Sequence, residues 1–183
     1  HTGWAAPALD DGQATVLRVS KDPVLSPGKL GTFDDNGVTP SCAIRIGTEV
    51  LLYYIGWNPG STTRMNIYGG LAVSTDDGDS FTRWSEAPIL ERSRTDPYIN
   101  TAPFVVADGR EFRMYHVSGA GWDDPDHPRY LPKTARSTDG KTWPRAGPAA
   151  TEFSGAEEKA LARPCVIAEA GCCRMRFAHK RRA

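Results

Sequence analysis

The sequence of 183 residues lacks a net charge, because 22 basic residues balance 22 acidic ones. Binding to phosphate groups needs an excess of positive charge, so this balance argues against a nucleic-acid partner and against an anionic membrane surface. The sequence also lacks any apolar run near the roughly 20 residues that span a bilayer. No basic segment followed by an apolar one comes after His1, so the chain is either mature or missing its start, and we favour a cytoplasmic location.

Cysteine is scarce and has no metal-binding pattern. None of the four cysteines forms a CxxC pair, and no histidine lies at the spacing of a zinc finger, which argues against structural zinc. We therefore expect no metal and no cofactor. We expect the cysteines to be small buried hydrophobic residues in a reducing compartment. They are Cys42, Cys165, Cys172 and Cys173.

What the sequence has in abundance is turn-forming residues, with 18 glycines and 14 prolines. This content argues against an all-helical fold. The hydrophobic share of 39% and the charged share of 24% are those of a folded domain rather than a disordered chain.

The chain also repeats itself at a period of about 60 residues. Residues 70–84 and 134–145 both contain Ser-Thr-Asp, then glycine, then an aromatic residue. Pro40, Pro103 and Pro164 each begin an apolar run, and they are 63 and 61 residues apart. Several features that share one register and one period indicate an internal repeat.

Each repeat has the pattern of four short strands. In the first copy, apolar and β-branched residues fill about 41–46, 49–56, 65–74 and 81–84, and Gly, Asp and Asn lie between them. Four antiparallel strands in about 60 residues are typical of a β-propeller blade. A β-sandwich competes, but it does not explain the long period. We predict one all-β, partial propeller domain over 1–183, with repeats at about 34–95, 96–157 and 158–183, and 14–32 as a possible strand of a closing blade.

An acidic residue precedes the proline of each repeat. These residues are Asp35, Asp96 and Glu158, which are 61 and 62 residues apart. In a propeller, the starts of the innermost strands gather at one mouth of the central channel, so we expect the three carboxylates to meet there. Crowded carboxylates raise one another's proton affinity, and glycosidic cleavage needs one protonated acid and one carboxylate. The alternative is that they are ordinary turn residues.

Aromatic and basic residues near the strand ends are candidates for substrate binding. Trp57 and Trp122 lie in glycine-rich stretches that we expect to be loops, where flat rings can stack on sugar faces. His116 is a candidate partner for a sugar hydroxyl, although a hydrogen-bonded histidine within a strand competes. Arg94 and Arg163 lie near the acidic residues and either clamp a substrate or pair with the acids.

Four motifs support a family resemblance: Phe33–Val38, Tyr53–Trp57, Thr95–Tyr98, and Glu158 together with Ala162–Pro164. Through them the chain resembles, over about 33–179, the five-bladed β-propeller glycosidases, which include arabinanases, β-xylosidases and β-fructosidases. The resemblance implies that Asp35 is the base or nucleophile, Asp96 the stabiliser that tunes the acid, and Glu158 the general acid. Asp34 and Glu157 are the alternatives to Asp35 and Glu158.

A second resemblance is to the Asp-box turn of sialidase propellers, which residues 74–81 fit. That turn lies far from the active site in such proteins, so it supports the fold and not the activity. The sequence thus favours a glycoside hydrolase-like propeller that acts on an oligo- or polysaccharide. A non-catalytic glycan-binding or interaction propeller, a glycoside phosphorylase and a sialidase-like propeller stay open.

The length of the chain indicates whether a complete ring of blades is present. Five repeats of about 61 residues need about 305 residues, more than this chain holds. We therefore expect a fragment, a truncated product or part of an oligomeric ring, with open blade edges that favour self-association and a site that is incomplete.

Overall fold

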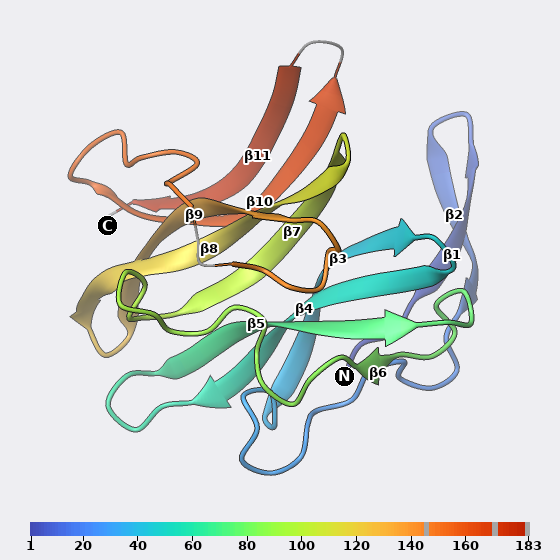
Figure 1. The fold of residues 1–183 in the computed structure, drawn as a ribbon, viewed down its shortest axis with the longest axis horizontal. Helices are drawn as coiled ribbons and strands as arrows, with labels where there is room; N and C mark the ends of the chain where they lie inside the picture. The colour runs from blue at the N-terminus through green and yellow to red at the C-terminus, as the bar shows by residue number, and fades with distance from the viewer. Residues whose placement is uncertain (145–146, 170–171, 182–183) are drawn as a thin grey trace.

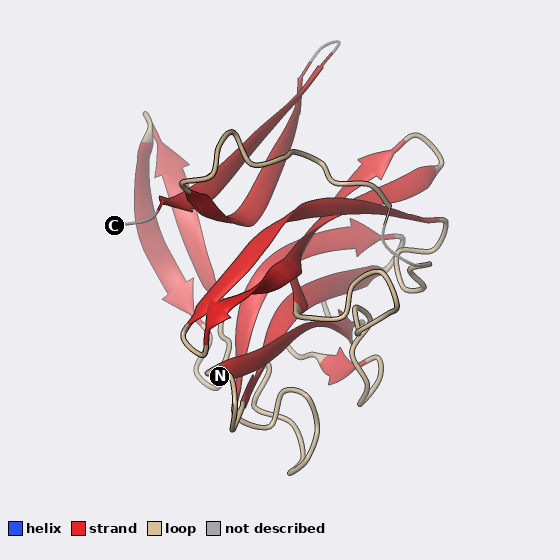
Figure 2. Ribbon diagram, turned by 90° about the vertical axis from the view of Figure 1, so that its left-hand side faces the viewer, coloured by secondary structure: helices blue, strands red, loops and turns tan. Residues whose placement is uncertain are grey.

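Strands make up all the regular structure of the chain (Figures 1 and 2). The computed structural model describes residues 1–144, 147–169 and 172–181. Within these ranges there is no helix, and so none that could cross a membrane. Residues 145–146, 170–171 and 182–183, which the expected second and third repeats include, lie outside the described residues. The expectation of an all-β fold is confirmed.

One sheet of nine strands contains three antiparallel units, which we call the first, second and third units. The first unit has four strands, as its sequence pattern predicts. Among the described residues the second unit has three, with only an isolated bridge between Lys133 and Ala149 beyond them, so the expectation of four strands in each repeat is wrong there. The turn between the first two strands of the second unit falls at Gly109, which has a φ of 66°. The first unit contains β3 (Gly37–Ile46), β4 (Glu49–Pro59), β5 (Met65–Ser74) and β6 (Thr82–Arg83); the second contains β7 (Asn100–Asp108), β8 (Glu111–Asp124) and β9 (His127–Ser137); the third contains β10 (Glu158–Glu169) and β11 (Cys172–Arg181).

The innermost strand of each unit runs in the same direction. Strands β3 and β5 both run antiparallel to β4, and β5 pairs in parallel with β7 through Tyr68 and Asn100. Strand β9 then pairs in parallel with β10 through Tyr130 and Ala160. Since β7 packs against both β3 and β10, the starts of these three strands lie at one end of the molecule.

The N-terminal residues form a separate hairpin, which Figure 1 shows projecting from the main sheet. It contains β1 (Ala5–Asp10) and β2 (Gln13–Val19), which pair only with each other. Part of the segment 14–32, which we expected to supply a strand to a closing blade, thus lies in this hairpin. A bridge between Thr2 and Leu25 closes the base of this segment. Leu25 then packs with Val38 and Tyr54 of the first unit, which ties the segment to the main sheet.

The main core lies between the first and second units. Leu51, Tyr53 and Leu71 from the first unit pack with Val105 and Met114 from the second. The buried Tyr53 hydroxyl donates a hydrogen bond to the carbonyl oxygen of Gly140 at 2.5 Å, 87 residues along the chain. This hydrogen bond and the apolar contacts fix the two units against each other.

The two Ser-x-Asp turns have equivalent hydrogen bonds. In the first, the Ser74 hydroxyl donates to Asp76 at 2.7 Å and accepts from the amide of Gly78 at 2.8 Å. Hydrogen bonds from Ser74 and Ser80 lower the pKa of Asp76 to about 2. In the second, Ser137 has the same roles toward Asp139 and the Gly140 amide. The shared serine and aspartate thus build the same turn twice.

The expected burial of the cysteines is wrong for three of the four. Only Cys42 is partly buried, whereas Cys165, Cys172 and Cys173 are exposed, and all four are free thiols. The reason is position: two of the three lie on β11, and this strand ends the sheet.

Candidate functional site

The three candidate carboxylates stand at the starts of the innermost strands. Asp35 lies two residues before β3, Asp96 lies four residues before β7, and Glu158 is the first residue of β10. Because these strands run in the same direction, all three residues belong to the same end of the sheet. Their surroundings nevertheless differ, and the hydrogen bonds of each have to be considered in turn.

Asp35 is half-buried and held by two donors. The amide of Gly31 donates to one of its carboxylate oxygens at 2.8 Å, and the side-chain amide of Asn58, near the end of β4, donates to the other at 2.8 Å. The carboxylate therefore has a fixed orientation, and it keeps part of its surface accessible.

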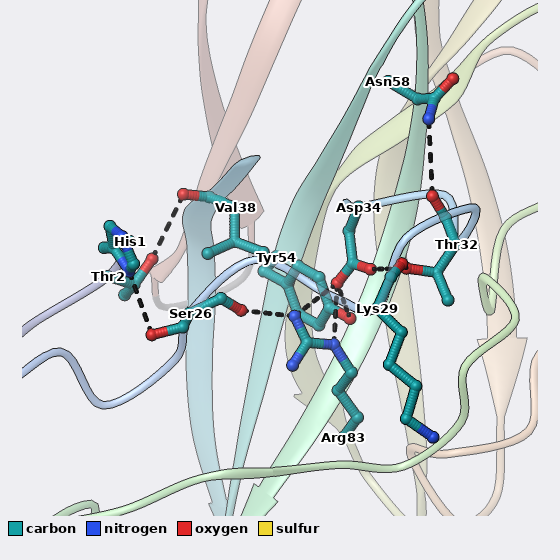
Figure 3. Close-up of polar contacts among 10 residues, drawn as sticks. All are labelled: His1, Thr2, Ser26, Lys29, Thr32, Asp34, Val38, Tyr54, Asn58 and Arg83. Carbon is teal, nitrogen blue, oxygen red and sulfur yellow. Dashed lines mark hydrogen bonds and ion pairs between the residues drawn. The ribbon is translucent and has the colours of Figure 1, made fainter. Parts of the chain in front are cut away.

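Asp34, the alternative to Asp35, is completely buried and paired. Figure 3 shows Tyr54 and Arg83 on one side of its carboxylate and Thr32 on the other. The Arg83 guanidinium contacts the same carboxylate oxygen through two nitrogens at 2.8 and 2.9 Å, and the Tyr54 hydroxyl donates to it at 3.0 Å. With 0% of Asp34 exposed, this group ties the loop before β3 to β6, and no substrate can reach it.

Asp96 is buried and lies over one face of the second unit. The hydroxyl of Ser118 on β8 donates to its Oδ1 at 2.6 Å, and the ammonium group of Lys133 on β9 donates to the same oxygen. Thr95 donates to Oδ2 at 3.2 Å. Burial raises the pKa of Asp96, but the hydrogen bonds from Lys133 and Ser118 and the lysine charge outweigh it, so the pKa lies below its ordinary value. Asp96 is therefore ionised at neutral pH.

Glu158 accepts a hydrogen bond from the backbone amide of Ser154 at 2.6 Å. This hydrogen bond is the main reason why the pKa of Glu158 is lowered, and the charges of His179 and Arg181 act in the same direction. A general acid at neutral pH needs a raised pKa. The surroundings of Glu158 in this structure thus favour the carboxylate form.

Trp57 and Arg163, two of the candidate binding residues, line the same cavity. It has a volume of about 230 Å³ and lies where β4, β7 and β10 meet. The Trp57 indole N–H donates to Thr39 at 2.9 Å, which fixes the ring, and Tyr130 lines another side. The buried Thr101 hydroxyl also lines the cavity and has no hydrogen-bond partner among the described residues. We call this space the Trp57 cavity.

The innermost strands β3, β7 and β10, two of which line the Trp57 cavity, have the same kind of backbone irregularity. Each innermost strand has a register shift next to its proline, at Pro40, between Thr101 and Phe104, and between Ala162 and Cys165. Ala102 and Arg163 have φ values of 50° and 49°, a left-handed conformation that non-glycine residues rarely adopt. Such strain is concentrated at functional sites in proteins.

Trp57 and Trp122 lie on β4 and β8, so the expectation that they lie in loops is wrong. The remaining candidate residues are distributed over different places. Trp122 lines a cavity of about 400 Å³ with Tyr98, Arg92 and the loop 60–63, and its ring packs beside the apolar cluster that includes Ile99. Arg94 is exposed on the loop before β7.

His116 is fully buried on β8 and lines a third cavity, of about 180 Å³, together with Asp96 and Asn100. The structure therefore brings together Asp96 with His116, and Trp57 with Arg163. No direct contact joins Asp35, Asp96 and Glu158 within the described residues, and of these three only Asp96 lines one of the cavities described above.

Sequence reasoning missed Lys133 and Ser118, the two residues that hold Asp96. Their side chains share a face because His116 pairs with Lys133 across β8 and β9, and Ser118 is two residues beyond His116. No local sequence signal marks either residue. Within the described ranges, no group of three or more His, Cys, Asp or Glu residues could hold a metal ion.

Comparison with known proteins gives relatives without an assigned activity. Two uncharacterized proteins, from two strains of Mycobacterium tuberculosis, are 36% identical to this chain over 163 residues. The match covers 88% of this chain and 54% of each relative, so the chain spans about half the length of the curated relatives it matches. No model of a known protein family matches the chain.

Solved structures show the class of fold. The sucrose-6-phosphate hydrolase of Lactobacillus gasseri is similar with a TM-score of 0.64 and 14% identity, over 90% of this chain and 31% of that one. The Bombyx mori GH32 β-fructofuranosidase has a TM-score of 0.61 and 19% identity, over 75% and 28%. A structure from the GH130 family of mannoside phosphorylases and hydrolases has a TM-score of 0.58 and 16% identity, over 94% and 50%.

The shared architecture is that of the β-propeller glycoside hydrolases. At these identities the similarity shows the fold alone, and the chain is accordingly an all-β protein with a partial propeller.

Proposed function

We propose that this chain contributes carboxylates to the cleavage of a glycosidic bond in an oligo- or polysaccharide. The observation that carries the proposal is the common direction of β3, β7 and β10, each of which has a carboxylate at its start. Cleavage needs two carboxyl groups on either side of the bond, and a propeller end can supply them from successive units. Among the structural neighbours, a variant of the silkworm β-fructofuranosidase is in complex with sucrose, which supports a carbohydrate substrate.

The proposed roles follow the resemblance and the surroundings of each group. Asp35, which is accessible and oriented by Asn58, is the base or nucleophile. Asp96, which Lys133 keeps ionised, is the stabiliser. Glu158 acts as the acid only when substrate or a neighbouring segment displaces the Ser154 amide, because that hydrogen bond favours its ionised form.

The length of the relatives supports a five-bladed ring. Since 163 residues are 54% of each relative, each has about 300 residues. Five units of about 61 residues need about 305. We propose that these relatives are five-bladed propellers and that this chain corresponds to about half of such a ring, with open edges able to self-associate. A structure of either relative tests the blade number.

The test of activity is a panel of aryl glycosides of arabinose, xylose, fructose and galactose, assayed with and without inorganic phosphate. We expect hydrolysis of at least one, reduced at least 100-fold in Asp35→Asn. The matched control is Glu111→Gln. Glu111 forms an ion pair with Arg136 and lies at the start of β8, at the opposite end of the sheet from the three carboxylates. Turnover that requires phosphate indicates phosphorolysis, which the GH130 neighbour makes the relevant alternative. Activity that is unchanged in Asp35→Asn overturns the assignment.

A second candidate function is carbohydrate binding without catalysis. The observation that favours it is the Trp57 cavity, which combines two aromatic rings with Arg163 but is lined by none of the three carboxylates. In this case, glycan binding persists when Asp35, Asp96 and Glu158 are all replaced by their amides, and it is lost in Trp57→Ala.

A further inference from the structure

A separate polar cavity lies between the first and second units, beside β8. Its volume is about 180 Å³, and its polar lining includes Asp96, Asn100 and His116. Its apolar lining includes Ile89, Leu90 and Trp143. We call it the His116 cavity. The residues that line it are different from those of the Trp57 cavity.

The polar wall contains atoms that the fold leaves unpaired. His116 has 0% of its surface exposed, yet neither ring nitrogen makes a hydrogen bond of normal geometry within the described residues, although the Val117 backbone lies near enough to oppose the lowering of the His116 pKa; Oδ1 of Asn100 also has no partner there. A buried polar group without a partner costs about 1–3 kcal/mol, and folded proteins leave few of them. Three such atoms around one cavity indicate that its occupant supplies the missing hydrogen bonds.

The protonation of these groups defines the occupant. Burial lowers the pKa of His116 to about 4, so the ring is neutral at pH 7, with one nitrogen donating and the other accepting. Oδ1 of Asn100 and the carboxylate of Asp96 can only accept. A ligand that matches all of them has several hydroxyl groups, since a hydroxyl both donates and accepts.

The charges around the cavity cancel. Lys133 pairs with Asp96, His116 is neutral, and Glu91 and Arg92, which also line the cavity, have opposite signs. These charges sum to zero, so a charged ligand would meet no net counter-charge. The apolar wall, with Trp143 in it, suits the C–H face of a sugar or polyol.

We propose that the His116 cavity binds an uncharged polyhydroxylated molecule, a monosaccharide or a short polyol, through His116, Asn100 and Asp96. The cavity, at about 180 Å³, is smaller than the roughly 300–1,000 Å³ of most ligand pockets, which favours a small ligand over an oligosaccharide. The inference concerns binding alone and holds whether or not the chain cleaves a glycosidic bond.

The test is a titration of the intact chain with xylose, xylitol and, as the charged arm, glucuronate, followed through the histidine ring resonances by NMR. We expect saturable shifts of the His116 signals with xylose or xylitol, and none with glucuronate. A preference between the first two distinguishes a closed ring from an open chain. His116→Phe should weaken the binding at least tenfold, and His116→Gln should weaken it less, because the amide keeps one donor and one acceptor.

The matched control is His127→Phe, which removes an exposed histidine bonded to Asp124 and should leave the affinity unchanged. If His116→Phe fails to fold, the His116→Gln titration decides. The proposal is overturned if neither neutral ligand gives saturable shifts, because water alone then fills the cavity. It is also overturned if the affinity survives both His116 substitutions and is lost in Trp57→Ala, because the ligand then occupies the Trp57 cavity.

Discussion

The ammonium group of Lys133 contacts the carboxylate of Asp96, 37 residues earlier in the chain. Only 3% of the Asp96 side chain and 23% of the Lys133 side chain are exposed, so the pair is shielded from solvent on most sides. Ser118 donates to the same oxygen from the neighbouring strand. A carboxylate that the sequence pattern marks as a candidate catalytic group is thus fixed by two adjacent strands.

Replacing Lys133 by methionine should destabilise the fold. Asp96 then loses its counter-charge while still buried, and removing one partner of a buried pair costs about 3–5 kcal/mol. We expect about 3 kcal/mol, because Lys133 keeps part of its surface in water. The loss should shrink as the pH falls from neutral into the acid range, since a lowered pKa of Asp96 contributes stability only while the group is ionised.

Urea unfolding of the wild type and of Lys133→Met, at pH 7 and in the acid range, measures this loss of stability. The control is Lys29→Met, which breaks the exposed pair with Glu86 and should cost less than about 0.5 kcal/mol. The double variant Asp96→Asn/Lys133→Met should recover part of the stability. Equal losses in Lys133→Met and Lys29→Met would contradict a buried pair.

Gly56→Ala should be destabilising because of the close packing around Asp34. A Cβ atom at this position would lie 2.4 Å from the Phe33 ring and 2.7 Å from the Cβ of Asp34, closer than real Cβ atoms approach. We expect a loss of about 2–3 kcal/mol in thermal or urea unfolding, as for overpacked cores. Gly37→Ala is the matched control, because its nearest contact would be 3.8 Å from Trp57, an ordinary distance. Similar stability of the two variants would mean that the Phe33–Asp34 loop moves freely.

Tyr53→Phe should weaken the contact between the first and second units only moderately. The substitution removes the hydrogen bond to the Gly140 carbonyl, but that oxygen still accepts from the Trp143 indole N–H at 3.1 Å. Because no acceptor is left unpaired, we expect about 1 kcal/mol in urea unfolding. Tyr98→Phe, at an exposed tyrosine, should change stability by less than half of that. A loss above about 3 kcal/mol would show that the ring itself has repacked.

The strands could be predicted from the sequence because their signals are local. Alternating apolar and β-branched residues bounded by Gly, Asp and Asn define them within a few residues, and the Ser74 and Ser137 turns likewise depend on neighbours in the sequence. Which of Asp34 and Asp35 is buried could not be predicted in this way. They are adjacent, and which of them is buried depends on Arg83, 49 residues beyond Asp34.

Local sequence patterns cannot predict the surroundings of Asp96 either, because these depend on the register of β8 against β9. A shift of one residue in that register would turn Lys133 to the other face of the sheet. The exposure of Cys172 and Cys173 has a similar origin, since cysteine composition indicates burial but not which strand ends the sheet.

His116 should make the fold sensitive to acid above the range in which carboxylates titrate. Burial lowers its pKa from 6.5 to about 4; the Asp96 charge and a hydrogen bond with the Val117 backbone oppose this, and the Lys133 charge adds to it. The unfolded chain therefore binds a proton between about pH 6.5 and 4 that the folded chain does not, and stability falls as the pH falls through this window. Between pH 7 and pH 5 we expect a loss of about 2 kcal/mol from this one group. Urea unfolding across that range should show the slope in the wild type and in His127→Phe, and a flatter profile in His116→Phe. Identical slopes in the wild type and His116→Phe would mean that the buried ring is not held neutral by the fold.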